Sequence, residues 1–283
     1  MEIGIQWPLV LFTLIAGAGF GLLATAGFAQ LVVKPCKATK QIALIAALAL
    51  LGIGGLMSVF HLAHPERFMG AIANLFSFSG IALELLGLAF GGVAAILFLL
   101  FVFMENKAGE RVLAACSIVI GVLASFLQGY AYCEVAAQPG WHIIALALSY
   151  LFTSLALGTL AYAAIAVAKA EDEAGLRLVG KVAFGLAALS VVSIVAYAVA
   201  LGGAGLLEGA ATIYAGVAVA FGVVTLAAAA WLAFKTPSLS LAVGAALAGV
   251  GGALCVRVLM WAVAAYQLNF IWEAATNRGL YLF

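Results

Sequence analysis

The residues best suited to chemistry lie in one short polar stretch, His61 to Glu84, between two long apolar runs. The stretch holds two of the three histidines of the chain, and it also carries Arg67 and Asn74. Glu84 already lies inside the next apolar run, and Arg257 lies in the final third of the last one. Charged side chains within apolar spans are rare and usually functional. These residues are therefore the first candidates for a site.

A carboxylate and a neutral imidazole can both act as proton acceptors near neutral pH. Oxidation of a quinol releases protons together with electrons, so its site needs an acceptor close to each ring hydroxyl. We therefore predict that Glu84 and His61 accept the protons of a quinol and orient its ring. The side chains expected to complete the pocket are Arg257, Asn74, Arg67, Gln128 and Tyr132.

Each of these residues also has a purely structural interpretation. Glu84 and Arg257 could form an ion pair between helices, and His61 could simply end its span at the interface. His64 is expected to face water, and His142 to anchor a span start at the membrane surface. Haem b would need two histidines on facing helices. Here only His61 and His142 could pair, and both lie at span ends.

Composition sets the class of protein that must position these residues. Of 283 residues, 67% are hydrophobic and only 8% are charged, and the mean hydropathy is +1.26. A soluble domain carries about 25% charged residues, so this chain must use lipid as its solvent. Apolar runs of this length without strict alternation predict helices rather than a barrel.

Charge and cysteine content exclude other classes. A net charge of +1 gives no field that would attract nucleic acid. The four cysteines lack the CxxC spacing of zinc sites, iron–sulfur clusters or covalent haem. We therefore expect neither haem nor an iron–sulfur cluster in this chain.

The sequence predicts an all-α integral membrane protein whose eight transmembrane helices form two four-helix bundles, with both termini outside. The expected spans are 8–33, 42–62, 79–103, 112–132, 142–168, 182–202, 210–234 and 239–265. We expect residues 1–266 to form the membrane domain and residues 267–283 a tail on the outer surface. Segment 68–78 is expected to form a short interfacial helix, and segment 169–181 a solvated linker.

Orientation follows from the basic residues. Nine of the twelve lie in the loops after spans one, three, five and seven, whereas the opposite side holds only Arg67 and Arg278. The positive-inside rule places the lysine-rich loops in the cytoplasm. Glu84, Arg257 and most other polar span residues then lie near the outer face, and we expect no comparable polar set in the inner half.

The motif His61-Leu62-x-x-Pro65-x-Arg67, continuing through Asn74 and Ser79 to Glu84, resembles the membrane anchor subunit of the dimethyl sulfoxide reductase family. Further similarity lies in Trp7-Pro8-Leu9, in Tyr132, Pro139 and Trp141, and in Arg257 with Trp261. The anchors of polysulfide and nitrite reductases are related. One departure is Gln128, which falls where the family often has an arginine before its tyrosine.

The resemblance implies a redox role at the outer face of a bacterial cytoplasmic membrane. Such anchors oxidise menaquinol and pass its electrons to an iron–sulfur subunit docked outside, which relays them to a molybdopterin catalytic subunit. The quinol-site histidine and glutamate of the family fall on His61 and Glu84, and Ser79 belongs to the same motif. The anchors carry no haem, so electrons must pass directly to the partner.

Two other classes of protein remain open. A secondary transporter or proton-conducting protein would also use intramembrane Glu and Arg, although transporters place them near the midplane, often between inverted repeats. A purely structural anchor would have no need of Glu84.

Overall fold

The computed structural model describes residues 5–60, 70 and 75–264. This part of the chain contains eight helices that are long and apolar enough to cross a membrane. They are α1 (Trp7–Val32), α2 (Lys37–Val59), α4 (Gly80–Phe103), α5 (Lys107–Cys133), α6 (Ile144–Ala168), α7 (Glu173–Gly203), α8 (Gly209–Phe234) and α9 (Leu239–Ala264). The 3₁₀ helix η2 (Leu75–Ser77) precedes α4, and no strand occurs among the described residues. The predicted all-α membrane fold is confirmed.

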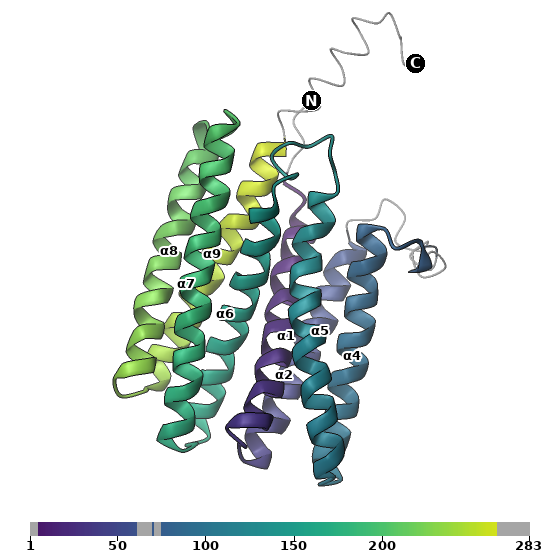
Figure 1. The fold of residues 1–283 in the computed structure, drawn as a ribbon, viewed down its shortest axis with the longest axis vertical. Coiled ribbons are helices and arrows are strands. Elements are labelled where there is room, and N and C mark those ends of the chain that lie inside the picture. The colour runs from purple at the N-terminus through teal and green to yellow at the C-terminus, as the bar shows by residue number, and fades with distance from the viewer. Residues whose placement is uncertain (1–4, 61–69, 71–74, 265–283) are drawn as a thin grey trace, which may run out of the picture.

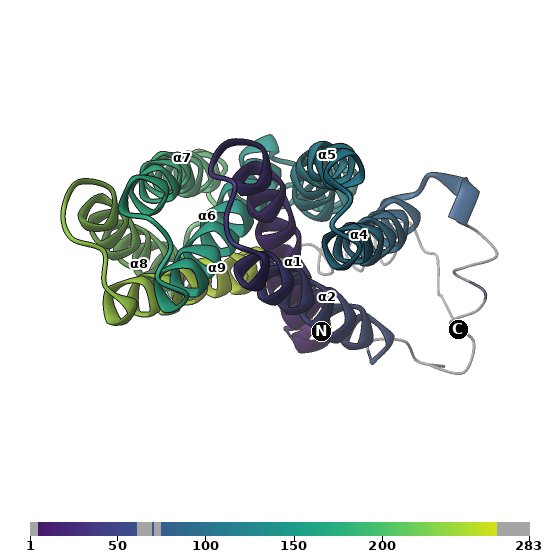
Figure 2. The ribbon, with the colours of Figure 1, turned by 90° about the horizontal axis from the view of Figure 1, so that it is seen from below.

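The helices run alternately up and down as two four-helix groups that lie side by side (Figures 1 and 2). Helices α1, α2, α4 and α5 form the first bundle, and α6, α7, α8 and α9 form the second. The junction between the bundles consists mainly of α6 packed against α1 and α5. Consecutive antiparallel helices joined by short loops produce this arrangement.

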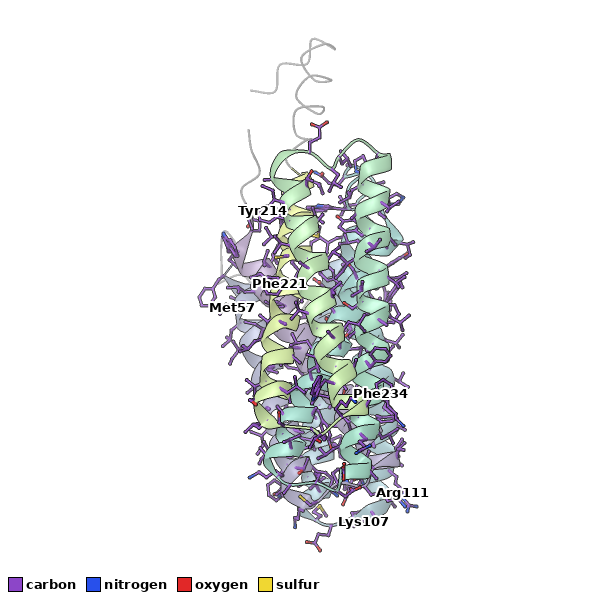
Figure 3. All side chains as sticks on the ribbon, turned by 90° about the vertical axis from the view of Figure 1, so that its left-hand side faces the viewer. Met57, Lys107, Arg111, Tyr214, Phe221 and Phe234 are labelled. Atoms are coloured by element: carbon purple, nitrogen blue, oxygen red, sulfur yellow. The ribbon has the colours of Figure 1, made fainter. Side chains whose placement is uncertain are left out.

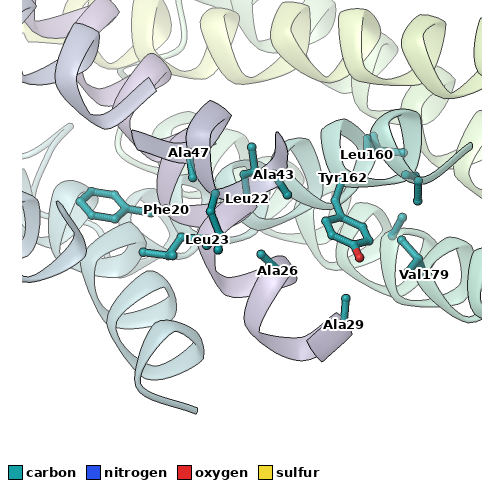
Figure 4. Packing of buried hydrophobic residues seen from close by; sticks show 14 of the residues in the cluster. Phe20, Leu22, Leu23, Ala26, Ala29, Ala43, Ala47, Leu160, Tyr162 and Val179 are labelled. Carbon is teal, nitrogen blue, oxygen red and sulfur yellow. The ribbon is translucent and has the colours of Figure 1, made fainter. Parts of the chain in front are cut away.

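Helix α1 lies at the centre of the molecule because its small residues let other helices approach on several sides. Phe20, Leu22 and Leu23 share one core with Ala43 and Ala47 of α2, and this core extends to Leu160 and Tyr162 of α6 (Figure 4). A side chain at Gly17, Gly21 or Gly27 would collide with α5 or α6, so these glycines permit close packing. Gly244 of α9, in contrast, meets no other helix.

The outer surface of the helices is apolar, and most charged residues of the described part of the chain gather at one end. Large hydrophobic side chains such as Ile45, Val93, Val192 and Leu247 are exposed, as expected for a surface that faces lipid. Lys107 and Arg111 lie at the end opposite Tyr214 (Figure 3). We call the end that carries the loops after α1, α4, α6 and α8 the lysine-rich end.

Several helices extend beyond the predicted spans. Segment 169–181, which we expected to be a solvated linker, is mostly the first part of α7, which begins at Glu173. The Asp172 side chain caps this helix by accepting a hydrogen bond from Gly175 N at 2.8 Å. Hydropathy detects only the part of a helix that lies in hydrocarbon, so it misses a polar first turn. Of the expected interfacial helix 68–78, the described residues include the short helix η2, and the predicted tail 267–283 lies outside them.

Candidate functional site

A cavity of about 460 Å³ lies in the first bundle at the end opposite the lysine-rich loops. Its wall is formed by the ends of four helices of that bundle, by the loop between α5 and α6, and by one residue of α9. The lining residues are Leu9, Phe12, Ser58, Val59, Ser79, Gly80, Ile81, Glu84, Leu85, Leu88, Ala131, Tyr132, Glu134, Val135, Trp141 and Trp261. Its volume lies in the range of small-molecule sites.

Glu84 is the charged group placed furthest into this cavity. It lies about one turn into α4, which begins after Ser79, and the Ser79 hydroxyl caps the helix by accepting a hydrogen bond from Ala82 N at 3.4 Å. The Glu84 Oε1 atom is buried and has no hydrogen-bond partner among the described residues. Buried polar atoms in native proteins are nearly always paired. The carboxylate is therefore available to a ligand in the cavity.

Aromatic rings form the wall that closes the cavity towards the second bundle. Tyr132 lies edge-to-face against both Trp141 and Trp261, with ring centroids 5.4 and 6.3 Å apart. Trp141 is held in place because its indole N–H donates to the carbonyl oxygen of Met260 at 2.8 Å. Such a wall can contact a flat ring by stacking or by edge contacts. The sequence indicated Tyr132 for the pocket, whereas we named the two tryptophans only as part of the family similarity.

Arg257 lies one helical turn deeper than Trp261 and does not line the cavity. Its side chain is completely buried and donates to Thr13 Oγ1 at 3.1 Å, Thr13 O at 2.9 Å and Ala253 O at 2.9 Å. The guanidinium also lies 4.3 Å from the centre of the Tyr150 ring and 3.4 Å from Ser154 Oγ. The structure forms no ion pair between Arg257 and Glu84. Arg257 instead joins α9 to α1 and α6.

Gln128 lies beside Arg257 rather than in the cavity wall. Its side chain is buried, and neither its amide oxygen nor its amide nitrogen has a partner among the described residues. A methyl group at Gly17 would lie 3.2 Å from both Gln128 Oε1 and Arg257 Nη2. Gln128 and Arg257 thus belong to a second polar cluster, one turn below Tyr132 and Trp261. The helix repeat explains this depth, because both residues precede a wall residue by four positions.

Several predicted site residues lie outside the described part of the chain. These are His61, Arg67 and Asn74, and His64, which we expected to face water, also lies outside it. The last described turn of α2 nevertheless brings Ser58 and Val59 to the cavity, and His61 follows Val59 by two positions in the sequence. Ser79 is described, and it both lines the cavity and caps α4.

His142 and Tyr197 stabilise the loop between α5 and α6. The Nδ1 atom of exposed His142 forms a hydrogen bond with the carbonyl oxygen of Cys133, near the end of α5. The buried Tyr197 hydroxyl donates to Gly140 O at 2.8 Å. These contacts agree with His142 as an interfacial anchor. The described residues contain no group of three or more His, Cys, Asp or Glu side chains that could hold a metal ion.

The lysine-rich end holds a buried polar cluster that we did not predict. At the lysine-rich end, Glu110 is completely buried and forms ion pairs with Lys40 at 2.6 Å and Lys107 at 2.8 Å. Gln30 donates a further hydrogen bond to it at 2.8 Å. Glu110 precedes the expected start of span four, so we expected it to lie in a loop. The three-residue spacing of Lys107 and Glu110, typical of an ion pair on a helix, is the sequence signal that indicates a helix there. Because the Glu110 carboxylate is paired, this cluster joins α1, α2 and α5 rather than leaving a carboxylate free.

Comparison with known proteins shows similarity to the anchor subunits of dimethyl sulfoxide reductases. The family model described as DMSO reductase anchor subunit (DmsC) matches residues 1–206. The anaerobic dimethyl sulfoxide reductase chain YnfH of Escherichia coli (strain K12) is 27% identical over 209 residues, which is 72% of this chain and 68% of that protein.

Proposed function

Because the chain belongs to the DMSO reductase anchor subunit family, we propose that it oxidises a membrane quinol in the cavity beside Glu84. The family and the fold establish the location of the chain and its general role. The chain is a multi-pass protein of the bacterial cytoplasmic membrane and the membrane anchor of a molybdopterin oxidoreductase complex. We further propose that the substrate is menaquinol. The proposed partners are an iron–sulfur electron-transfer subunit and a molybdopterin catalytic subunit, both docked on the outer face.

The observation that carries the proposal is the buried Glu84 Oε1 atom, which has no hydrogen-bond partner among the described residues and lies in an otherwise mostly apolar cavity. A quinol hydroxyl would donate a hydrogen bond to this oxygen and later transfer its proton to it. Tyr132, Trp141 and Trp261 would contact the ring. His61 would accept the second proton, with Ser79, Asn74 and Arg67 as further polar contacts. Arg257 and Gln128 would act from one turn below the ring rather than touch it.

Electrons would pass directly from the quinol to the iron–sulfur subunit, because we assign no redox group to this chain. The cavity lies at the end of the first bundle opposite the lysine-rich loops, immediately below the loop 134–143. This position supports a short transfer distance to a docked iron–sulfur subunit. A transporter site would lie near the middle of the membrane, so the location of the cavity does not favour that alternative.

Glu84→Gln tests the proposal because glutamine keeps the size of the side chain and removes its basic oxygen. We expect the variant complex to assemble normally and to lose quinol oxidation by about 100-fold or more, the usual range for one acid–base group. Turnover is measured with the purified complex and a reduced quinone. Glu208→Gln, an exposed residue at the same end outside the cavity, is the matched control. Wild-type turnover in Glu84→Gln would show that the carboxylate is structural.

A further inference from the structure

Helices α2 and α4 lose their buried faces as they approach the cavity. On α2, buried residues recur from Thr39 to Gly54, but none occurs between 55 and 59. On α4, buried residues recur from Gly91 to Val102, whereas between 83 and 90 none is buried. These two helices also touch each other less extensively than the other neighbouring pairs of the first bundle. The bundle is therefore open between the ends of α2 and α4 that flank the cavity.

The cavity reaches the surface of the bundle at this opening. Val59 of α2 and Leu85 and Leu88 of α4 line it. Ile81 also lines it, and 65% of the Ile81 surface is exposed. Beside the opening, the outward-facing Leu56 of α2 is likewise exposed. A passage with apolar walls and an apolar exterior connects the cavity to lipid rather than only to water.

We propose that the ligand enters sideways from the bilayer between α2 and α4, and that its hydrocarbon tail remains in the seam that these helices leave open beside Val59, Leu85 and Leu88. This inference rests on the proposed function, because it concerns the route and the tail of the same ligand. Along α4, the polar lining residue comes first and the apolar ones follow, which is the order that a ligand with a polar head and a hydrocarbon tail requires. Glu84 lies one turn nearer the helix start than Leu88, so a polar head at Glu84 leaves the tail beside Leu85 and Leu88.

Gly55 lies at the deeper end of this seam, one turn below Val59, where α2 and α4 come into contact. A Cβ atom at Gly55 would meet only Leu88 Cδ1, at 3.6 Å, which is ordinary contact. Alanine therefore fits at this position, whereas a larger side chain would extend across the seam. Gly52, almost one turn away on the same helix, would meet nothing within 4 Å. The two glycines form a matched pair, one beside the seam and one on the open surface of α2.

The test compares a long-chain menaquinol with the tail-less naphthohydroquinone menadiol as substrates of the intact complex in proteoliposomes. For Gly55→Leu we expect kcat/KM with menaquinol to fall about tenfold or more relative to kcat/KM with menadiol, mainly through KM, as for a side chain misplaced in an apolar pocket. Gly52→Leu should leave this ratio at the wild-type value. Gly55→Ala, which fits the structure, should show a smaller decrease in the same direction.

An unchanged ratio in both Gly55 variants would overturn the lateral route, and so would an equal decrease for both substrates or the same effect in Gly52→Leu. If Gly55→Leu does not assemble, the ratio of kcat/KM with menaquinol to kcat/KM with menadiol in Gly55→Ala tests the lateral route instead. Failure of the proposed function looks different. In that case the wild-type complex oxidises neither quinol, or Glu84→Gln oxidises menadiol at the wild-type rate.

Discussion

Arg257 is a completely buried cation whose guanidinium has no carboxylate partner among the described residues. Removing a charge from water costs several kcal/mol unless other groups compensate. Here the compensation comes from the oxygens of Thr13, Ser154 and Ala253 and from the face of the Tyr150 ring. The planar guanidinium reaches acceptors on three helices at once. Arg257 therefore stabilises the junction between the two bundles.

Arg257→Lys should destabilise the protein because an ammonium group cannot reproduce this fork of donors. We expect a loss of about 2 kcal/mol, the scale of hydrogen bonds made by a charged group, measured by unfolding of the detergent-solubilised protein. Arg177→Lys is the control, because exposed Arg177 bonds only the neighbouring Glu173 on its own helix. Its effect should stay below about 0.5 kcal/mol. Equal effects of the two substitutions would contradict the structural role of Arg257.

The sequence identified candidate site residues but did not predict which of them lie together. Glu84, Ser79 and Tyr132, which remain predicted site residues, line the same cavity. Arg257 and Gln128 were expected there and instead form a cluster one turn deeper. A sequence gives the spacing along a helix, but not the exact depth and rotation of one helix against another. Trp141 and Trp261 were missed as wall residues for the same reason, since they reach the cavity from a loop and from the other bundle.

At the lysine-rich end, three helices are followed by a residue in the left-handed backbone conformation. Helix α6 ends at Ala168, and Ala170, two positions later, lies in the left-handed region at φ 54°. The next amide, Glu171 N, donates back to Ala166 O at 3.1 Å. Lys34 and Glu105 adopt the same conformation at the ends of α1 and α4. Glycine is the usual residue at such positions. Hydropathy carries no information about this geometry, although the predicted ends of these three spans, at 33, 103 and 168, lie within one residue of the observed ends.

Ala170→Gly should stabilise the protein because glycine adopts positive φ without the steric penalty of a Cβ atom. The expected gain is about 1 kcal/mol, visible as a higher melting temperature in detergent. Ala168→Gly is the matched control, because exposed Ala168 is the last residue inside α6. Glycine there should destabilise by up to about 1 kcal/mol. A loss of stability in Ala170→Gly would contradict the assigned helix end.

At the scale of the whole molecule, the sequence predicted eight helices in two bundles but not their arrangement. Length and hydropathy are sufficient to count spans, and short loops make neighbours antiparallel. All spans have similar apolar compositions, so nothing in the sequence distinguishes the central helices α1 and α6 from those that face lipid. Glycines at 17, 21 and 27 hinted at close packing of α1, but not at which helices would pack against it.

Orientation in the membrane can be tested through Cys36, an exposed residue in the loop between α1 and α2 at the lysine-rich end. The positive-inside rule places this end in the cytoplasm, so a membrane-impermeant maleimide should label Cys36 in inverted vesicles and not in intact spheroplasts. Cys116 and Cys255 lie within spans, and Cys133 is buried. Ala204→Cys, made in a Cys36→Ser background, adds an exposed thiol at the opposite end and should be labelled in spheroplasts. The reverse pattern would place the Glu84 cavity on the cytoplasmic side, so that protons from the quinol would be released inside.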